Sequence, residues 1–311
     1  MASKLVIGTR GSKLALYQAN LVKSKLEIAY PTLEVVINVI KTKGDKILDI
    51  ALIKIGDKGF FTKEIQDALY NKEVDIAVHS LKDLPTELPK GSQLGAILER
   101  VNHRDVLVSI GGKKLADFTA KDKIATSSLR RKSQLLQMNK QAQVVEIRGN
   151  VDTRIRKMND GHCDGIIMAA AGIERLGLQE HITEYLNETQ MLTAPGQGAI
   201  AIEIRKEDNE ILEMLSLLNH EQSAICVTAE RSFLNRLEGG CQIPFAAHAT
   251  LDGDTLTVEG LVATLDGRKI QREKIIGNSK DAMQLGIDLA NSIKDNGGYE
   301  ILEEVKRELN N

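Results

Sequence analysis

Short apolar runs alternate with amphipathic stretches along the first part of the chain. Residues 4–9, KLVIGT, are typical of a strand, and residues 12–30 carry apolar positions at helical spacing behind Ser12, a suitable N-cap residue. A second strand is expected in 33–42, a helix in 62–73 and a third strand in 74–80. This βαβαβ order predicts a mostly parallel sheet whose functional groups lie at the carboxyl ends of its strands.

The same order of elements returns after residue 120. The segments IGTRGSKLALYQANL and IATSSLRRKSQLL both contain a strand, a hydroxyl residue, a basic residue and a helix. The repeat predicts two similar α/β domains that face each other across a cleft, with helix N-termini suited to anions. The second unit is expected to consist of strand 122–127, helix 128–138, strand 142–150, helix 151–160 and a strand with its helix in 163–177.

The connection KTKGDKILDIALIKIGDKGFFTKE, residues 41–64, is longer than most loops and rich in Gly and Lys. One interpretation is a lid beside the cleft, which would let Lys54, Lys58 and Phe61 approach a bound ligand. The alternative is that ILDIALIKI is only an extra strand or helix that covers the core.

The last third of the chain has a different pattern. Residues 221–237 and 281–295 have helical spacing, and residues 245–277 alternate like three strands joined by Asp-Gly turns, which predicts a small α+β domain. Before it, 193–208 is predicted to cross over and add a strand to the first sheet. Two crossings between the α/β domains would form a hinge.

Composition limits the possible settings. The 311 residues favour two or three domains, and 42% hydrophobic and 27% charged residues are typical of a folded, soluble protein. The net charge of -2 argues against general attraction to nucleic acid or membranes. No secretory signal or membrane-spanning run is recognisable. We therefore expect a cytoplasmic protein, and nothing in the charge pattern requires more than a monomer.

Basic residues gather at the predicted corners between strands and helices. A single arginine of this kind is usually a solvated surface charge, but several together in a chain of net charge -2 predict a focused positive cleft. Arginine suits planar carboxylates, so the expected ligand carries carboxylate or phosphate groups. The residues are Arg10, Lys82, Arg130, Arg131, Arg148, Arg154 and Arg175.

The three cysteines do not form an even disulfide set or a C-x-x-C pair. Cys163 and Cys226 lie in apolar patterns and are expected to be small buried residues. Cys241, in RLEGGCQIPF, instead follows two glycines and precedes a proline, on what must be a turn. No metal site is expected, because zinc needs three or four ligands at characteristic spacings and the six histidines are scattered.

The segment ERSFLNRLEGGCQIPFA resembles the cofactor-attachment signature of the porphobilinogen deaminase family. Seven further segments resemble that family in the same order along nearly the whole chain: IGTRGSKLAL, KTKGDKI, DIAVHSLKDLP, IATSSLRRKSQLL, IRGNVDTRIRK, AAAGIERLG and APGQGAIAIE. The resemblance implies two α/β domains of the type II periplasmic-binding-protein kind with mixed sheets, plus a small α+β domain with a three-stranded antiparallel sheet. The implied boundaries are 1–98 with 199–217, 104–193, and 220–311.

The resemblance also implies an activity. Members of the family are transferases that condense four porphobilinogen molecules head to tail, with loss of ammonia, and release linear hydroxymethylbilane by hydrolysis, a step of tetrapyrrole and heme biosynthesis. The chain grows on a dipyrromethane primer held by a thioether, and Cys241 matches the attachment cysteine. No metal, nucleic acid or membrane partner is implied.

Asp83 matches the catalytic aspartate of the family. The sequence alone favours an N-cap or turn carboxylate ahead of Leu84 and Pro85. The match favours the catalytic role instead, in which a carboxylate stabilises the cationic methylene-pyrrolenine left by deamination. Cofactor or substrate binding is implied for Arg10, Ser12, Gln18, Lys54, Lys58, Phe61, Ser80, Lys82, Thr126, Ser128, Arg130, Arg131, Arg148, Gly149, Asn150, Arg154, Ala169, Arg175 and Gln197.

Two rival functions use the same features. His248 could be the base that activates Cys241 in a cysteine hydrolase, although seven residues along a predicted strand would carry it away from the thiol. A solute-binding module would also use two hinged α/β domains with a basic cleft, but it gives no reason for an exposed cysteine.

Overall fold

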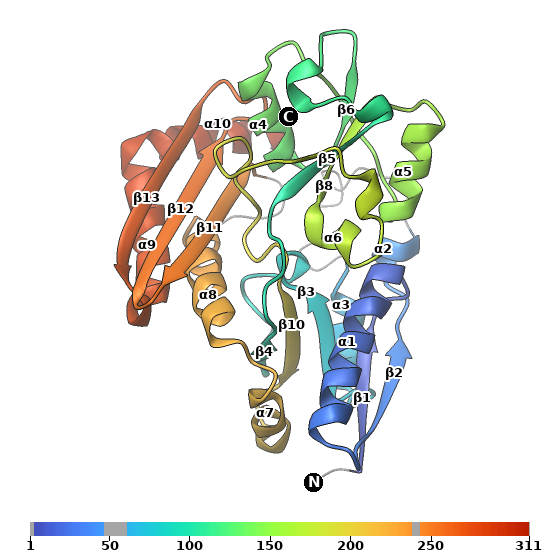
Figure 1. Cartoon of the computed structure of the whole chain (residues 1–311). Helices are drawn as coiled ribbons and strands as arrows, with labels where there is room; N and C mark the ends of the chain where they lie inside the picture. Colours follow the sequence, from blue (N-terminus) through green and yellow to red (C-terminus); the bar gives the residue numbers. More distant parts are fainter. Residues whose placement is uncertain (1–2, 47–60, 238–242, 311) are drawn as a thin grey trace. The chain divides into compact units, whose positions relative to one another are not determined.

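A computed structural model describes residues 3–46, 61–237 and 243–310. By compactness the chain divides into two units. Of the described residues, unit 1 comprises 3–46, 61–101 and 198–224, and unit 2 comprises 102–197, 225–237 and 243–310. Three sheets are present in the described residues, two of five strands and one of three (Figure 1). The predicted boundaries of three separate domains stay a prediction.

Unit 1 is built on a mixed sheet with the strand order β2-β1-β3-β10-β4. β1 is parallel to β2 and β3, whereas β10 is antiparallel to β3 and β4. The predicted return of the chain to the first sheet is therefore confirmed. The elements are β1 (Lys4–Thr9), α1 (Lys13–Ala29), β2 (Glu34–Val39), α2 (Lys43–Lys46), α3 (Lys63–Tyr70), β3 (Ile76–Ser80), β4 (Ser92–Ile97), β10 (Ile200–Arg205) and α7 (Asn209–Ser216).

Helices pack on the sheet of unit 1 through two separate apolar clusters. One cluster joins Val22 and Leu26 of α1 and Leu215 of α7 to strand residues such as Ile7 and Ile202. A second cluster gathers residues of α3 with Val74 and Ala77. Burial at three- and four-residue spacing on α1 explains why this amphipathic stretch forms a helix.

Unit 2 contains a second five-stranded sheet with the order β7-β6-β8-β5-β9. β6 is parallel to β7 and β8, and β5 is antiparallel to β8 and β9. This order is the same as that of unit 1, with β5 in the place of β10, so the predicted repeat is confirmed at the level of the sheets. The elements are β5 (Asp105–Ser109), β6 (Lys123–Ala125), α4 (Leu129–Met138), β7 (Gln143–Val145), α5 (Val151–Asn159), β8 (Gly165–Ala169), α6 (Ala170–Glu174) and β9 (Glu184–Tyr185).

The three-stranded antiparallel sheet completes unit 2, and the Asp-Gly hairpins expected from the sequence are confirmed. Its inner face packs on helices through Phe233, Leu289 and Val305. Its other face contributes Ala246 and Leu261 to a cluster with Leu192. The elements are α8 (Glu221–Arg236, whose first residues belong to unit 1), β11 (Phe245–Asp252), β12 (Thr255–Ala263), β13 (Ile270–Asn278), α9 (Ala282–Ile293) and α10 (Tyr299–Asn310).

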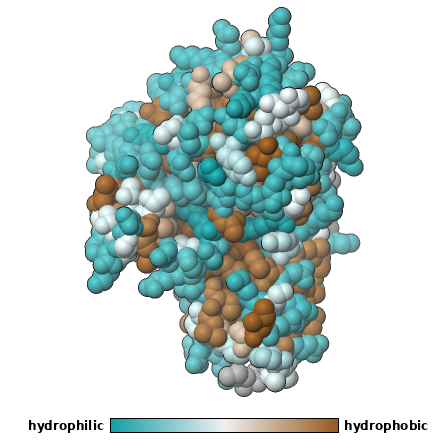
Figure 2. Space-filling model, viewed as in Figure 1, coloured by the Kyte–Doolittle hydropathy of each residue, from teal (hydrophilic) through white to brown (hydrophobic). Residues whose placement is uncertain are grey.

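Figure 2 shows one face of the molecule, on which hydrophilic side chains predominate and apolar ones gather in the lower part of the view. Unit 1 has exposed apolar residues of its own, among them Ile28 and Leu217, which are 80% and 68% exposed. A pocket between β4 and α7 is lined by Gly95, Asn209, Leu212, Glu213, Ser216 and Asn219. None of the predicted ligand-binding residues that the structure describes lines it.

Candidate functional site

Unit 1 brings its predicted site residues to one edge of its sheet. β1 and β3 are parallel neighbours, with Gly8 opposite Ala77, so the residues that follow both strands emerge at the same edge. Ser12 caps α1 by accepting a hydrogen bond from the backbone N–H of Ala15 (3.2 Å). Lys82 and Asp83 lie exposed in a short 3-10 turn directly after β3.

Gln18 connects α1 to the end of β3. Its amide nitrogen donates to the hydroxyl of Ser80 (2.8 Å), and that hydroxyl lies 3.2 Å from the amide oxygen. Gln18 is only 2% exposed. It therefore holds the strand end beside the helix N-terminus, and its predicted contact with a ligand stays a prediction.

The guanidinium carbon of Arg10 lies 4.2 Å from the centroid of the Phe61 ring, a cation–π contact. The two residues come from the end of β1 and from the last part of the segment interpreted as a lid. Lys54 and Lys58 lie outside the described residues, as does the stretch that would distinguish a lid from an extra strand or helix.

Unit 2 repeats the arrangement at the carboxyl ends of β6, β7 and β8. Ser128 caps α4 by accepting from the backbone N–H of Arg131 (3.4 Å), as Ser12 does in unit 1. Buried Thr126 follows β6, Ala169 ends β8, and half-buried Arg175 follows α6. The sequence repeat therefore identifies corresponding positions of the two sheets.

Two arginines lie at the entrance to α5. Half-buried Arg148 precedes Gly149, whose φ of +119° and close approach to Thr153 exclude a side chain: an added Cβ would lie 2.7 Å from Thr153 Cγ2. Arg154 donates from Nε to the carbonyl oxygen of Gly149 (2.7 Å). Asn150 occupies the N-cap position without a side-chain capping bond. The turn thus fixes the direction in which Arg154 leaves the helix.

Arg130 and Arg131 are buried, whereas the sequence predicted cations that line an open cleft. Each is 6% exposed, and both pair with Asp105, which is fully buried on β5. Arg130 Nη1 lies 2.7 Å from Asp105 Oδ2, and Arg131 donates from Nε (3.1 Å) and Nη2 (2.8 Å) to Oδ1. The physical reason is that two buried guanidinium groups need a counter-charge, which the sequence reading did not identify. Their binding of a ligand stays a prediction.

Gln197 joins the same network. Its amide nitrogen donates to Asp105 Oδ1 (2.9 Å) and to the carbonyl oxygen of His103 (2.7 Å), and the residue is 1% exposed. Burial raises the pKa of Asp105, but the charges of Arg130 and Arg131 and the hydrogen bonds from Arg130 and Gln197 outweigh it and hold that pKa well below its usual range. Asp105 is therefore ionised at neutral pH.

The two cysteines that the structure describes have the environment that the sequence predicted. Cys163 and Cys226 are buried, and burial, with the nearby Asp164 carboxylate, raises the pKa of Cys163 to about 11. That thiol is protonated at neutral pH and is a poor nucleophile. Cys241 lies outside the described residues.

His248 lies on β11 with its ring stacked on that of His103 and its Nδ1 3.5 Å from the carboxylate of Glu230. The sequence reading considered it only as a rival base for Cys241. Its two neighbours come from distant parts of the chain, so no local motif could have indicated them.

These features define a class of protein: a multidomain α/β protein in which two sheets of identical strand order present arginine and hydroxyl side chains at the ends of parallel strands. Residues 5–213 match the family described as "Porphobilinogen deaminase, dipyromethane cofactor binding domain", and residues 224–295 match "Porphobilinogen deaminase, C-terminal domain". The chain belongs to the porphobilinogen deaminase family, and the dipyrromethane cofactor expected from the sequence is that of its matching domain.

Curated relatives of that name match over nearly their whole length. The protein from Syntrophomonas wolfei subsp. wolfei is 51% identical over 307 residues, which cover 97% of this chain and 99% of the relative. The protein from Geobacter sulfurreducens is 49% identical, with 97% and 95% covered. The protein from Trichlorobacter lovleyi is 47% identical, with 98% of both chains covered.

Solved structures give much more distant likenesses. An ancestral arginine-binding protein bound to arginine has 13% identity and a TM-score of 0.40, with 70% of this chain and 91% of that chain covered. The BenM effector binding domain with benzoate has 14% identity and a TM-score of 0.42, with 69% and 90% covered. Similarity at this level says nothing about ligands. Among the described residues, no helix is long and apolar enough to cross a membrane.

Proposed function

We propose that this chain condenses four porphobilinogen molecules head to tail on a dipyrromethane primer bound to Cys241, loses ammonia at each addition and releases hydroxymethylbilane by hydrolysis. The observation that supports it most strongly is the match of both family domains, over residues 5–213 and 224–295. We further propose that the protein acts in the cytoplasm as a monomer, without nucleic acid or membrane partners.

The donor set of each unit fits a polypyrrole. Each pyrrole of the primer or substrate carries an acetate and a propionate, and the arginine and hydroxyl groups at the strand ends are suitable partners for carboxylates. The half-buried cations Arg10, Arg148, Arg154 and Arg175 are proposed to bind these groups, with capping residues Ser12 and Ser128 beside them. When bound, the primer supplies the acceptor pyrrole for the first addition.

Arg130 and Arg131 have a proposed role of a different kind. Because Asp105 accepts from both guanidinium groups, each arginine keeps a fixed direction, and its remaining N–H groups can be aimed at a ligand carboxylate. A preorganised donor of this sort loses little side-chain entropy on binding.

Asp83 is the proposed catalytic residue. Loss of ammonia from porphobilinogen develops positive charge on the pyrrole, and an exposed carboxylate at the end of β3 is suited to stabilise that charge. Lys82 beside it is proposed to bind a substrate carboxylate. The proposal needs the pyrrole nitrogen to come within hydrogen-bonding reach of an Asp83 oxygen.

The intact mass of the denatured protein tests covalent priming. Wild type should carry a surplus equal to one dipyrromethane, Cys241→Ser should lack it and turn over no porphobilinogen, and Cys226→Ser, which changes a buried thiol, should keep it. An unmodified chain that still consumes porphobilinogen would refute the proposal.

A further inference from the structure

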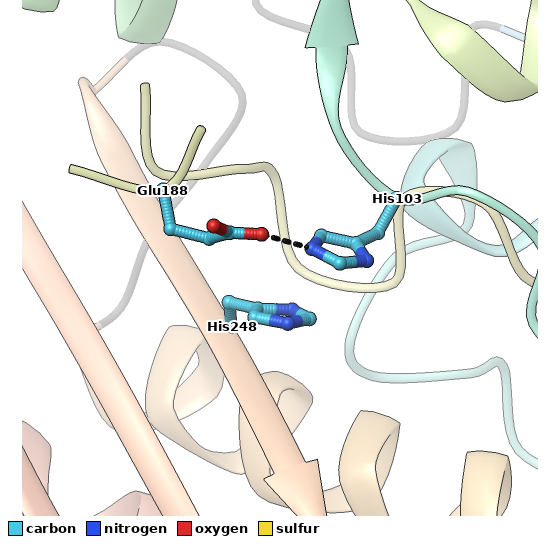
Figure 3. A group of neighbouring side chains, drawn as sticks. All are labelled: His103, Glu188 and His248. Carbon is cyan, nitrogen blue, oxygen red and sulfur yellow. Dashed lines mark hydrogen bonds and ion pairs between the residues drawn. The ribbon is translucent and has the colours of Figure 1, made fainter. Parts of the chain in front are cut away.

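Three side chains from distant segments meet within unit 2: His103, just before β5, Glu188, after β9, and His248, on β11 (Figure 3). His103 Nε2 lies 2.7 Å from Glu188 Oε1. The rings of His103 and His248 are stacked, with centroids 3.8 Å apart and planes inclined by 15°. One potential ligand atom from each of the three residues lies within 4.8 Å of the other two.

Burial makes this cluster different from a surface pair. His248 is 9% exposed, and its Nδ1 is buried without a hydrogen bond to any described residue. Glu230 Oε1 lies 3.5 Å from that nitrogen. Glu230 is fully buried and is itself fixed, since it accepts from the backbone N–H groups of Gly196 (2.7 Å) and Ala249 (2.8 Å).

The charges around the cluster favour a cation. The half-buried Glu188 carboxylate lies beside the two imidazoles, with its Oε1 2.7 Å from His103 Nε2. Arg272 does not compensate that carboxylate, because its Nη2 donates to the backbone oxygen of Glu188 (2.8 Å) and its Nε to Glu259 (2.8 Å). Two carboxylates, Glu188 and Glu230, thus flank two imidazoles.

We propose that His103, His248 and Glu188 form a binding site for a divalent transition-metal ion of the Zn²⁺ class. Two imidazoles and one carboxylate are a common zinc ligand set, with a fourth position left for water. Glu230 faces Nδ1 of His248, which assigns the metal to Nε2 and gives Glu230 the outer-sphere role of orienting the ring. The six histidines looked scattered in the sequence because two of these ligands meet only in the folded chain.

Binding requires a small rearrangement. Lone pairs of imidazole lie in the ring plane, so two stacked rings cannot both direct them at one ion, and one ring must turn about its Cβ–Cγ bond. The ion takes the place of the proton shared by His103 and Glu188, which leaves to solvent. The 2.7 Å contact between Nε2 and Oε1 must widen to about 3.4 Å, since both atoms would lie about 2.0 to 2.2 Å from the metal with a near-tetrahedral angle between them.

A bound ion would join segments of unit 2 that are far apart in the sequence. His103 is the second residue after the chain enters unit 2 at Asn102, and Glu188 belongs to the segment that leads back to unit 1 at Gly198. His248 belongs to the strand that follows the segment containing Cys241. A bound ion would therefore fasten both connecting segments to β11.

Titration of the purified, primer-loaded protein with Zn²⁺, after removal of metal by EDTA and in competition with a chromophoric chelator, tests the site. Wild type should bind one equivalent. Glu188→Gln, His103→Asn and His248→Asn should each weaken binding at least about 10-fold. His181→Asn is the matched control, because His181 and Glu180 form an exposed pair (3.5 Å) outside the cluster and should have no influence.

Thermal unfolding gives a second readout that does not depend on activity. Zn²⁺ at about 100 times its Kd should raise the Tm of wild type by about 5 °C and leave the Tm of Glu188→Gln unchanged. Glu188→Gln is the decisive variant, because its half-buried side chain can keep a hydrogen bond to His103 and the protein should still fold. Binding that is absent in wild type, or equal in wild type and Glu188→Gln, would overturn the proposal.

Discussion

The residues around Asp83 position its carboxylate but do not shield it from water. It lies exposed in the turn after β3, three residues after Ser80, whose hydroxyl Gln18 holds. The substrate itself would therefore have to exclude water from the carboxylate, which makes the proposed stabilisation of charge specific to the reacting complex.

Asp83→Asn should lower the rate of porphobilinogen consumption about 100-fold or more, because one preorganised electrostatic contact contributes about 3 to 4 kcal/mol in the transition state. A stopped assay of porphobilinogen consumption measures this. Asp67→Asn, an exposed change on α3, is the control and should be neutral. Near-normal turnover by Asp83→Asn would remove the residue from the mechanism.

Arg154→Leu should reduce turnover about 10- to 100-fold, because it removes one hydrogen bond between a charged donor and a ligand carboxylate. Arg156→Leu changes an exposed arginine of the same helix and should cost less than twofold. The masses of denatured protein with bound intermediates would show whether the chain stalls at one length. Equal losses in both variants would indicate damage to α5 instead.

Asp105→Asn should destabilise the protein by about 3 to 5 kcal/mol near pH 7, because two buried guanidinium groups would lose the carboxylate with which both of them pair. The folded pKa of Asp105 is lower than the unfolded value of about 3.9, so its contribution is present above about pH 4 and disappears as pH falls through the folded pKa. Denaturant unfolding of wild type and variant at several pH values measures the difference.

The control for that experiment is Asp122→Asn. Hydrogen bonds from Lys113 and Thr119 lower the pKa of Asp122 to about 2, but this group is only half-buried, with 18% of its side chain exposed, so its removal should cost far less. If Asp105→Asn and Asp122→Asn lowered the free energy of unfolding equally, the burial of Asp105 with Arg130 and Arg131 would not explain the loss.

At the scale of elements, the sequence predicted those features that depend on residues close together in the chain. The capping role of Ser12 follows from a hydroxyl residue ahead of an apolar helical pattern, and the structure confirms it. Ser128, which was not predicted as a cap, has the same role at the start of α4. The pairing of Arg130 and Arg131 with Asp105 was missed, because no strand was predicted at 105–109. Side-chain contacts between distant antiparallel strands and helices leave no periodic signal in one sequence.

The β12–β13 hairpin packs closely against α4, the helix that carries Arg130 and Arg131. Gly267 has a φ of +67°, and an added Cβ would lie 2.1 Å from the carbonyl oxygen of Ser133. Gly253, in the β11–β12 turn, has a φ of +55° but no heavy atom within 4 Å of its added Cβ. The two turns therefore have similar backbone requirements and different surroundings.

Gly267→Ala should consequently lower the free energy of unfolding by about 1 to 3 kcal/mol more than Gly253→Ala. Gly253→Ala introduces only the strain of an alanine in a left-handed backbone conformation, without a steric clash. Urea unfolding of both variants measures this difference. Equal losses would mean that the hairpin moves away from α4 without cost.

At the scale of the whole molecule, the two five-stranded sheets share one strand order but differ in how the chain supplies them. β5 to β9 come from one continuous stretch, 105–185. In the other sheet, β10 lies between β3 and β4 although it follows them by about a hundred residues, and β4 joins that sheet through β10.

This has a consequence for the order of events on the ribosome. Synthesis proceeds from the N-terminus at about 5 to 20 residues per second, and domains generally fold as units when their chain is complete. The second sheet can pair once residue 185 has emerged, whereas the first waits for Arg205. The part of the protein that is made first is therefore among the last to close, and until then the apolar edge of β3 depends on the nascent chain, or a chaperone, for cover.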